Sequence, residues 1–171
     1  MILRDLGPDD AAEITLVARR MRDTLIEVEG AERGATLYTL EWLEQRVRWH
    51  LDRRHTTGRV VVTLDDRGEI VGHSIFRIEG RDAGPYGLIS TTYVVPAARR
   101  GGCAVALLQA AEAWFVEQGI SHCCTWTSST NVPLIRLYTR AGYAETERGP
   151  NDLTDTIMVR LSRQLPVAKG R

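Results

Sequence analysis

Lysine is almost absent from this chain, which carries nearly all of its positive charge on arginine. Lys169 is the only lysine among 22 basic residues, and 22 acidic residues balance them to a formal net charge of zero. A P-loop needs a lysine directly after its glycines, so the sequence excludes that phosphate-binding motif. A chain without net charge also lacks the basic field that nucleic acids and anionic membrane surfaces attract.

Cysteines and long apolar runs are also scarce. Cys103, Cys123 and Cys124 form neither an even disulfide framework nor a C-x-x-C pair, so we expect three reduced thiols. No apolar run reaches the ~18 residues of a membrane-spanning helix. Arg4 and Asp5 interrupt the start of the chain, where a signal peptide would begin. We therefore expect a cytoplasmic protein that spans no membrane, and no His/Cys spacing suggests a metal site.

The size and composition of the chain favour a single domain. Of its 171 residues, 43% are hydrophobic and 26% are charged, which is enough to bury a core. We expect one domain over residues 1–165 and an unstructured tail over residues 166–171.

The strongest functional signal lies between Thr91 and Gln118. The stretch begins as a β-branched, apolar strand, which Pro96 ends because proline has no N–H to give a neighbouring strand. From Gly102 onward, apolar residues recur at steps of three and four, as they do on the buried face of a helix. These residues are Ala104, Leu107, Leu108, Ala111, Trp114 and Phe115.

A basic, glycine-rich turn joins this strand to this helix. The first N–H groups of a helix lack intrahelical partners, and the helix dipole adds positive potential there. Gly101 and Gly102 remove the Cβ atoms that would keep a phosphate away, while Arg99 and Arg100 add charge and donors. The turn therefore predicts a phosphate or pyrophosphate site, although its glycines lack the G-x-G-x-x-G spacing of a dinucleotide site. The alternative is a plain solvated turn.

The same turn resembles a known motif. Arg99, Gly102 and Ala104 follow the pattern R-x-x-G-x-A, and Val94 and Pro96 precede them as V-x-P. This resembles the coenzyme A pyrophosphate loop of the GNAT superfamily of N-acetyltransferases.

A second motif follows in the order found in that family. Asn131, Tyr138, Gly142 and Tyr143 lie in the segment NVPLIRLYTRAGY, which is similar to the N…Y…GF segment of GNAT proteins. The resemblance extends over roughly the whole chain. It implies that acetyl-CoA is the acetyl donor and that the acceptor is a primary amine of a small molecule or peptide.

The other elements follow from hydrophobic periodicity and turn chemistry. The expected strands are 2–5, 60–64, 69–79, 86–95, 121–128, 144–148 and 153–161, and the expected helices start at Pro8, Thr39, Gly102 and Pro133. The order β-αα-βββ-α-β-α-ββ fits an α/β (α+β) sandwich, with a mixed, mostly antiparallel sheet of six to seven strands and about four helices. It is also the GNAT order.

The resemblance implies roles for several residues. The strand edge from Tyr93 to Val95 would pair with the pantetheine amides, and the backbone amides from Arg100 to Ala104, including that of Cys103, would hold the pyrophosphate. Tyr138 would act as general acid near the sulfur, because a phenol with a pKa near 10 is protonated at neutral pH. Asn131 would contact the pantetheine arm. The alternatives are a core tyrosine and a simple helix N-cap.

The sequence does not identify a general base. The strand before the basic turn carries no carboxylate or histidine, whereas many GNAT proteins have a glutamate there. The remaining candidates are His73 and Glu79 on the preceding strand, Glu29 and Glu32 in an acidic segment, and a water held by Ser90 and Thr92.

The acceptor site is also left open. The resemblance places it between the loop joining the first two helices and the closing hairpin, where several carboxylates would attract a cationic amine: Glu27, Glu29, Glu32 and Asp152. Trp42 and Trp49 form either an aromatic wall of this site or a surface for core or dimer burial. The resemblance also implies a possible homodimer, because homodimers are common in the GNAT superfamily. Two other readings remain: a non-catalytic acyl-CoA-binding or regulatory module, and a subunit of a larger assembly.

Overall fold

The computed structural model describes residues 1–80, 84–152 and 154–166. It contains seven strands: β1 (Ile2–Asp5), β2 (Gly58–Leu64), β3 (Ile70–Glu79), β4 (Tyr86–Val94), β5 (His122–Ser128), β6 (Ala144–Pro150) and β7 (Ile157–Gln164). They form one sheet in the order β1-β2-β3-β4-β5-β7-β6, in which only β4 and β5 pair in parallel. The expected tail lies outside the described residues except for Pro166.

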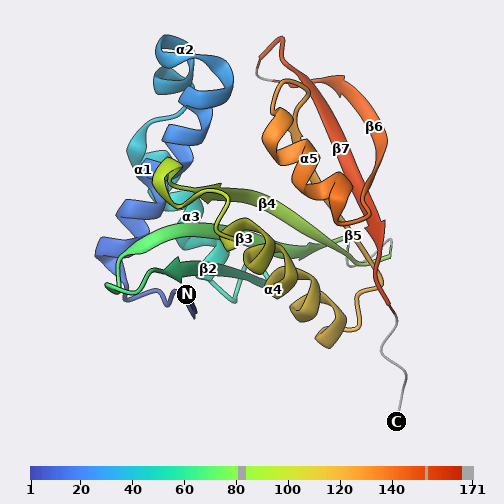
Figure 1. Ribbon diagram of the computed structural model, residues 1–171, viewed down its shortest axis with the longest axis horizontal. Coiled ribbons are helices and arrows are strands. Elements are labelled where there is room, and N and C mark those ends of the chain that lie inside the picture. Colours follow the sequence, from blue (N-terminus) through green and yellow to red (C-terminus); the bar gives the residue numbers. More distant parts are fainter. Residues whose placement is uncertain (81–83, 153, 167–171) are drawn as a thin grey trace.

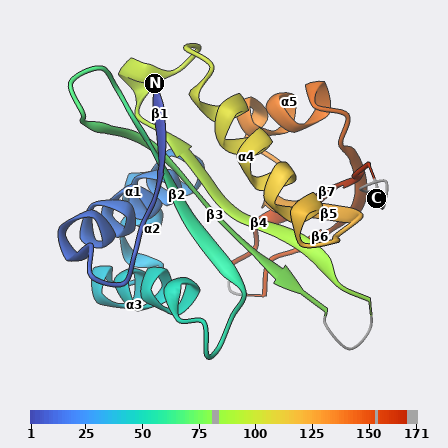
Figure 2. The ribbon, with the colours of Figure 1, turned by 90° about the horizontal axis from the view of Figure 1, so that it is seen from below.

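Five α-helices cover the two faces of the sheet. They are α1 (Ala11–Glu29), α2 (Ala31–Thr36), α3 (Leu40–Leu51), α4 (Cys103–Glu117) and α5 (Val132–Arg140), with a short 3₁₀ turn at Pro96–Ala98. The first three helices lie on one face and the last two on the other (Figures 1 and 2). None of the described helices combines the length and apolar character needed to cross a membrane.

The expected order of elements is confirmed, and α2 is added to it. The acidic segment, which the sequence places in a loop after the first helix, is itself helical. Glu27 and Glu29 belong to the last turn of α1, and Glu32 belongs to α2. Gly30, with a φ of 90°, separates the two helices. Gly34 lets α2 pack directly on α1, because a Cβ at this position would collide with the backbone of Ile26.

The closing hairpin differs from the expectation in its turn. Pro150 still pairs with Ile157, so the connection covers residues 151–156 and β7 begins four residues later than the sequence suggests. The polar residues that continue past Pro150 therefore belong to the connection.

Two hydrophobic cores hold the layers together. On one face, Ile14 and Val17 of α1 and Val47 of α3 pack against β2 and β3. On the other, Leu107 and Phe115 of α4 pack against β4 and α5. The predicted apolar stripe of α4 is buried except for the partly buried Ala104. Thr39 caps α3 as expected, since its Oγ1 accepts the Trp42 N–H at 3.1 Å.

The strands β4 and β5 separate in the middle of the sheet. They pair only where Gly87, Leu88 and Ile89 face residues 123–125. A register shift in the pairing with β3 leaves Ser90 as an extra residue of β4, directly after this short ladder. Such a bulge bends the strand and redirects side chains. Beyond it the two strands diverge (Figure 1).

The paired end of β4 depends on the missing side chain of Gly87. A Cβ at this position would lie 2.6–2.7 Å from ring atoms of Phe115 on α4. We expect Gly87→Ala to lower the free energy of unfolding by about 1–3 kcal/mol, because the fully buried ring has no room to move. Gly149→Ala is the matched strand control, since a Cβ there meets no atom within 4 Å. Urea unfolding of both variants measures the difference, and equal stabilities would contradict this account.

Candidate active site

A cavity of about 320 Å³ lies at the divergence of β4 and β5. Its floor is formed by Ser90–Thr92 of β4 and Thr125–Ser128 of β5, and α1, α3 and the β6–β7 connection supply the walls. The cavity therefore brings together segments from both ends of the chain.

Tyr138 lies directly behind this floor. Its side chain is 1% exposed, and its hydroxyl hydrogen-bonds to the hydroxyls of Thr92 and Thr125, which both line the cavity. Thr125 donates its own proton to the Ile89 carbonyl at 2.8 Å, which holds its side chain against β4. Burial raises the pKa of Tyr138, and the two hydrogen bonds oppose part of that rise. The phenol is thus neutral at neutral pH, and it lies behind the residues that line the cavity.

Asn131 caps α5 and also lines the cavity. Its Oδ1 accepts the Leu134 N–H at 3.4 Å, while its Nδ2 donates to Thr127 Oγ1 at 3.1 Å. The cap that the sequence offered as an alternative is therefore present, and the residue still faces the space between the strands.

The basic turn before α4 presents unpaired backbone donors. Arg100 has a φ of 65° and Gly102 a φ of 85°, both in the left-handed region. No group in the described part of the chain accepts a hydrogen bond from the N–H groups of residues 100–105. This is the geometry of an anion site at a helix N-terminus.

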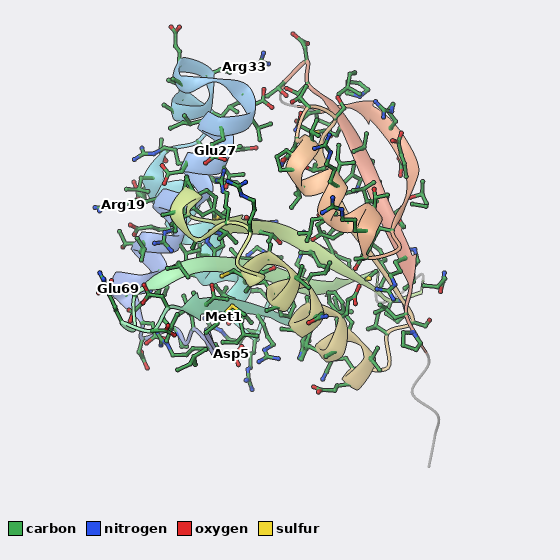
Figure 3. The ribbon with its side chains drawn as sticks, in the orientation of Figure 1. Met1, Asp5, Arg19, Glu27, Arg33 and Glu69 are labelled. Atoms are coloured by element: carbon green, nitrogen blue, oxygen red, sulfur yellow. The ribbon has the colours of Figure 1, made fainter. Side chains whose placement is uncertain are left out.

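The two arginines of this turn differ in their contacts. The Arg99 guanidinium donates to both carboxylate oxygens of Glu27, at 2.7 and 2.9 Å, and to the Val94 carbonyl at 2.8 Å. Glu27 projects from α1 (Figure 3). Arg99 thus ties the turn to α1. Arg100 is exposed and forms no ion pair within the described residues.

Of the carboxylates in the acidic segment, only Glu29 reaches the cavity. Its side chain is 12% exposed, and both of its oxygens accept from Thr156 Oγ1, at 2.7 and 2.8 Å. Glu32 lies on the exposed side of α2 and lines a separate shallow hollow. The expected cluster of acceptor-binding carboxylates is therefore reduced to one side chain, because Glu27 pairs with Arg99, α2 carries Glu32, and Asp152 does not line the cavity.

The two base candidates on β3 lie outside the cavity. Glu79 forms an ion pair with Arg77, and its carboxylate does not line the cavity. His73 is completely buried between β2 and β4, and neither ring nitrogen has a hydrogen-bond partner among the described residues. Of the candidates named from sequence, the cavity brings together Glu29, Ser90 and Thr92. The described part of the chain contains no group of three or more His, Cys, Asp or Glu side chains that could hold a metal ion.

Sequence reasoning missed a polar network on the α3 side of the cavity. His50 donates from Nδ1 to the Arg46 carbonyl at 2.7 Å, which leaves Nε2 to accept from Arg77 at 2.9 Å. Arg77 also donates to Ser90 Oγ at 3.0 Å. Burial, opposed by the bond to Arg46 and reinforced by the charge of Arg77, lowers the pKa of His50 to about 4. The spacing of four from Trp42 to Arg46 to His50, all of which line the cavity, was the available signal.

Unpaired amides at a helix N-terminus, next to a strand opening backed by a neutral phenol, fit the GNAT resemblance of the sequence. Comparison with known proteins agrees. The sequence model of the acetyltransferase (GNAT) family matches residues 20–143. The chain therefore belongs to the GNAT family, and it is an acyltransferase.

Individual relatives support the fold and the family. An aminoglycoside N(6')-acetyltransferase type 1 from Serratia marcescens is 32% identical over 71 residues. The matched part is 42% of this chain, and it spans about half the length of that relative (49%). A GNAT-family acetyltransferase from Streptococcus pneumoniae aligns over 96% of this chain and 99% of its own, with a TM-score of 0.72 and 16% identity. A ribosomal-protein-alanine N-acetyltransferase from Brucella melitensis aligns over 96% and 100%, with a TM-score of 0.71 and 20% identity.

The buried histidine of β3 predicts a pH-dependent stability. Burial, with a smaller effect of the Arg20 charge, lowers the pKa of His73 to about 3 in the folded protein, whereas the unfolded value is about 6.5. Below pH ~6.5 the unfolded chain therefore binds a proton that the folded chain does not, so stability falls as the pH drops. Above pH ~6.5 both states are neutral and this contribution is constant.

Substituting the histidine should reduce that fall. We expect the loss of unfolding free energy between pH 7.5 and pH 5 to be smaller in His73→Leu than in the wild type, as measured by urea unfolding at both pH values. His55→Leu, at an exposed position, serves as the control and should keep the wild-type loss. Equal losses in all three proteins would show that His73 is not responsible.

Proposed function

We propose that this acyltransferase moves an acetyl group from acetyl-CoA to a primary amine of a small molecule or peptide by direct transfer. The observation that carries the proposal is the opening between β4 and β5, with the buried phenol of Tyr138 behind its floor and unpaired amides at the start of α4. A thioester donor with a pyrophosphate group needs both features.

The donor would bind along the described edge and turn. The backbone amides from Arg100 to Ala104 would hold the pyrophosphate, with Arg100 adding charge. Arg99 would contribute only by exchanging its present partner Glu27 for the phosphate. The edge of β4 from Tyr93 to Val95 would pair with the pantetheine amides, and Asn131, which lines the cavity, would contact the arm.

The acceptor nitrogen would attack the thioester carbonyl, and the carbon–sulfur bond would then break. Tyr138 would donate its proton to the departing sulfur, which suits a neutral phenol hydrogen-bonded to two hydroxyls of the floor. The proton of the amine would leave through a water held by Ser90 and Thr92. Ser90 is suited to this task because its oxygen already accepts from Arg77, which leaves its own proton available to orient a water.

The proposal also includes a cytoplasmic location and assembly as a homodimer. All three cysteines are buried free thiols, which suits the reducing cytoplasm. The family resemblance makes a homodimer the expected assembly, and sedimentation at micromolar concentration would measure it.

Binding of acetyl-CoA should stabilise the protein through the turn before α4. At a hundredfold excess over the dissociation constant, the ligand adds about 2.7 kcal/mol to the free energy of unfolding. Thermal unfolding should show this gain in the wild type, a smaller gain in Gly102→Ala, whose Cβ hinders the approach of the phosphate, and none in Gly102→Glu, whose carboxylate also repels the pyrophosphate. Both variants carry the same strain at the left-handed position, so they differ in charge and side-chain size rather than in backbone conformation. If acetyl-CoA stabilises none of these proteins, the turn is not a donor site.

The role of Tyr138 has a matched control in Tyr143. Both tyrosines are buried and their rings contact edge to face at 4.8 Å, but the Tyr143 hydroxyl lies within 3.0 Å of Cys123 Sγ and away from the floor. We expect Tyr138→Phe to lower the rate constant of thiol release by about 10²- to 10⁴-fold with little change in acetyl-CoA binding. Tyr143→Phe should retain the rate. Full activity of the Tyr138→Phe variant would show that the phenol takes no part in the mechanism.

A further inference from the structure

Two arginines share one wall of the cavity. Arg46 of α3 and Arg77 of β3 both line it, and both lie against the ring of Trp49. Their guanidinium carbons are 4.4 and 5.5 Å from the ring centroid, respectively. The wall therefore concentrates two positive charges beside one aromatic face.

Only one of these charges has a counter-ion. Arg77 forms an ion pair with Glu79 and also donates to His50 and Ser90. Arg46, within the described part of the chain, forms no ion pair, and its guanidinium donates no hydrogen bond. Burial lowers the pKa of Arg46, and the neighbouring charge of Arg77 acts in the same direction. The charge of Glu79 acts in the opposite direction, but Glu79 forms its ion pair with Arg77, so Arg46 is a half-buried cation without an ion pair of its own among the described residues.

The remaining titratable groups of the cavity do not compensate this charge. His50, with a pKa of about 4, is neutral at neutral pH, and its two nitrogens are occupied by the Arg46 carbonyl and by Arg77. Glu29 faces the cavity from α1, but both of its oxygens accept from Thr156, and Arg33 lies 3.9 Å away.

We propose that Arg46 binds an anionic group of the acceptor, so that the acceptor is an amine that also carries a carboxylate or a phosphate. This inference rests on the proposed function and names its substrate class. A planar guanidinium matches either oxyanion with two parallel hydrogen bonds. It also reverses the expectation from sequence, in which carboxylates would attract a purely cationic amine.

The rest of the cavity suits an acceptor with an apolar body. Tyr38 and Trp42 stack with their ring centroids 4.3 Å apart and line the cavity beside Arg46. Leu25, Val28 and Leu37 add aliphatic surface to the same space. An apolar amino acid combines the three required parts: an amine, a carboxylate and a hydrophobic side chain.

Direct binding to the protein without acetyl-CoA tests the inference. Isothermal titration would compare L-leucine, L-methionine and L-phenylalanine with their carboxamides, and O-phosphoethanolamine with ethanolamine. We expect at least one anionic probe to bind about 10- to 100-fold more tightly than its neutral partner, as a charged hydrogen-bond pair allows. A larger ratio for the amino acids identifies a carboxylate, and a larger ratio for the phosphate pair identifies a phosphate. If no anionic probe binds more tightly than its partner, the inference is wrong.

Substitutions on α3 assign the effect to Arg46. Arg46→Met keeps the length of the side chain and should abolish the preference, whereas Arg46→Lys should retain part of it. Arg48→Met is the matched control, because Arg48 is exposed on the same helix and, among the described residues, its guanidinium hydrogen-bonds to the Pro8 carbonyl alone, at 3.4 Å. A preference that survives in Arg46→Met, or that disappears equally in Arg48→Met, overturns the assignment.

The two proposals can fail separately. Stabilisation by acetyl-CoA without any anion preference would leave the acetyltransferase function intact and refute the role of Arg46. An anion preference that depends on Arg46, in a protein that acetyl-CoA does not stabilise, would support the anion site and contradict the proposed function.

Discussion

The short parallel ladder between β4 and β5 is the constraint on which the site depends. Three residue pairs hold the strands together, and the side chain of Thr125 reinforces the last pair by donating to the Ile89 carbonyl. The bulge at Ser90 follows at once, so the strands part at a defined residue. Everything assigned to the chemistry lies around that point: the hydroxyls of Thr92 and Thr125, the phenol behind them, and the polar network that ends at Ser90.

The two cores fix this opening from opposite sides. On one face, α4 presses Phe115 against the paired end of β4 through the space that Gly87 leaves. On the other, α1 and α3 rest on β2 and β3 and carry their polar side chains past the core into the cavity. The ion pair between Arg99 and Glu27 links the turn on one side to the helix on the other. The turn before α4 and the α1 wall of the cavity are therefore joined by a direct contact.

Local features of the fold could be predicted from sequence because their causes are local. The stripe of α4, the cap at Thr39 and the glycine turn each depend on residues a few positions apart. The motifs around Arg99 and Tyr138 identified the family for the same reason. The helix α2 was missed because its packing depends on the absence of a side chain at Gly34, whose effect appears only once α1 is in place.

The polar network could not be predicted in this way. His50 and Arg77 are 27 residues apart and Arg99 and Glu27 are 72 apart, so their pairing follows from strand register and helix placement rather than from spacing. The sequence likewise could not show which carboxylates were already engaged. Glu79 looked available on its strand, yet it forms an ion pair with Arg77, and this pairing leaves Arg46 without an ion pair in the described part of the chain.

The divergence of β4 and β5 also leaves an unpaired strand edge, to which a strand of another chain could add. An unpaired strand edge invites another chain to add to it, and proteins usually protect such edges with charge or brevity. The perimeter follows that rule: β1 is only four residues long and carries Arg4 and Asp5, while β6 carries Glu145, Glu147 and Arg148. The edge of β4 beyond Ile89 is protected differently, because it lies inside the sheet with helices on both faces (Figure 2). That stretch therefore faces the gap toward β5 rather than the perimeter of the sheet, so it is not presented to other chains as a free edge strand would be.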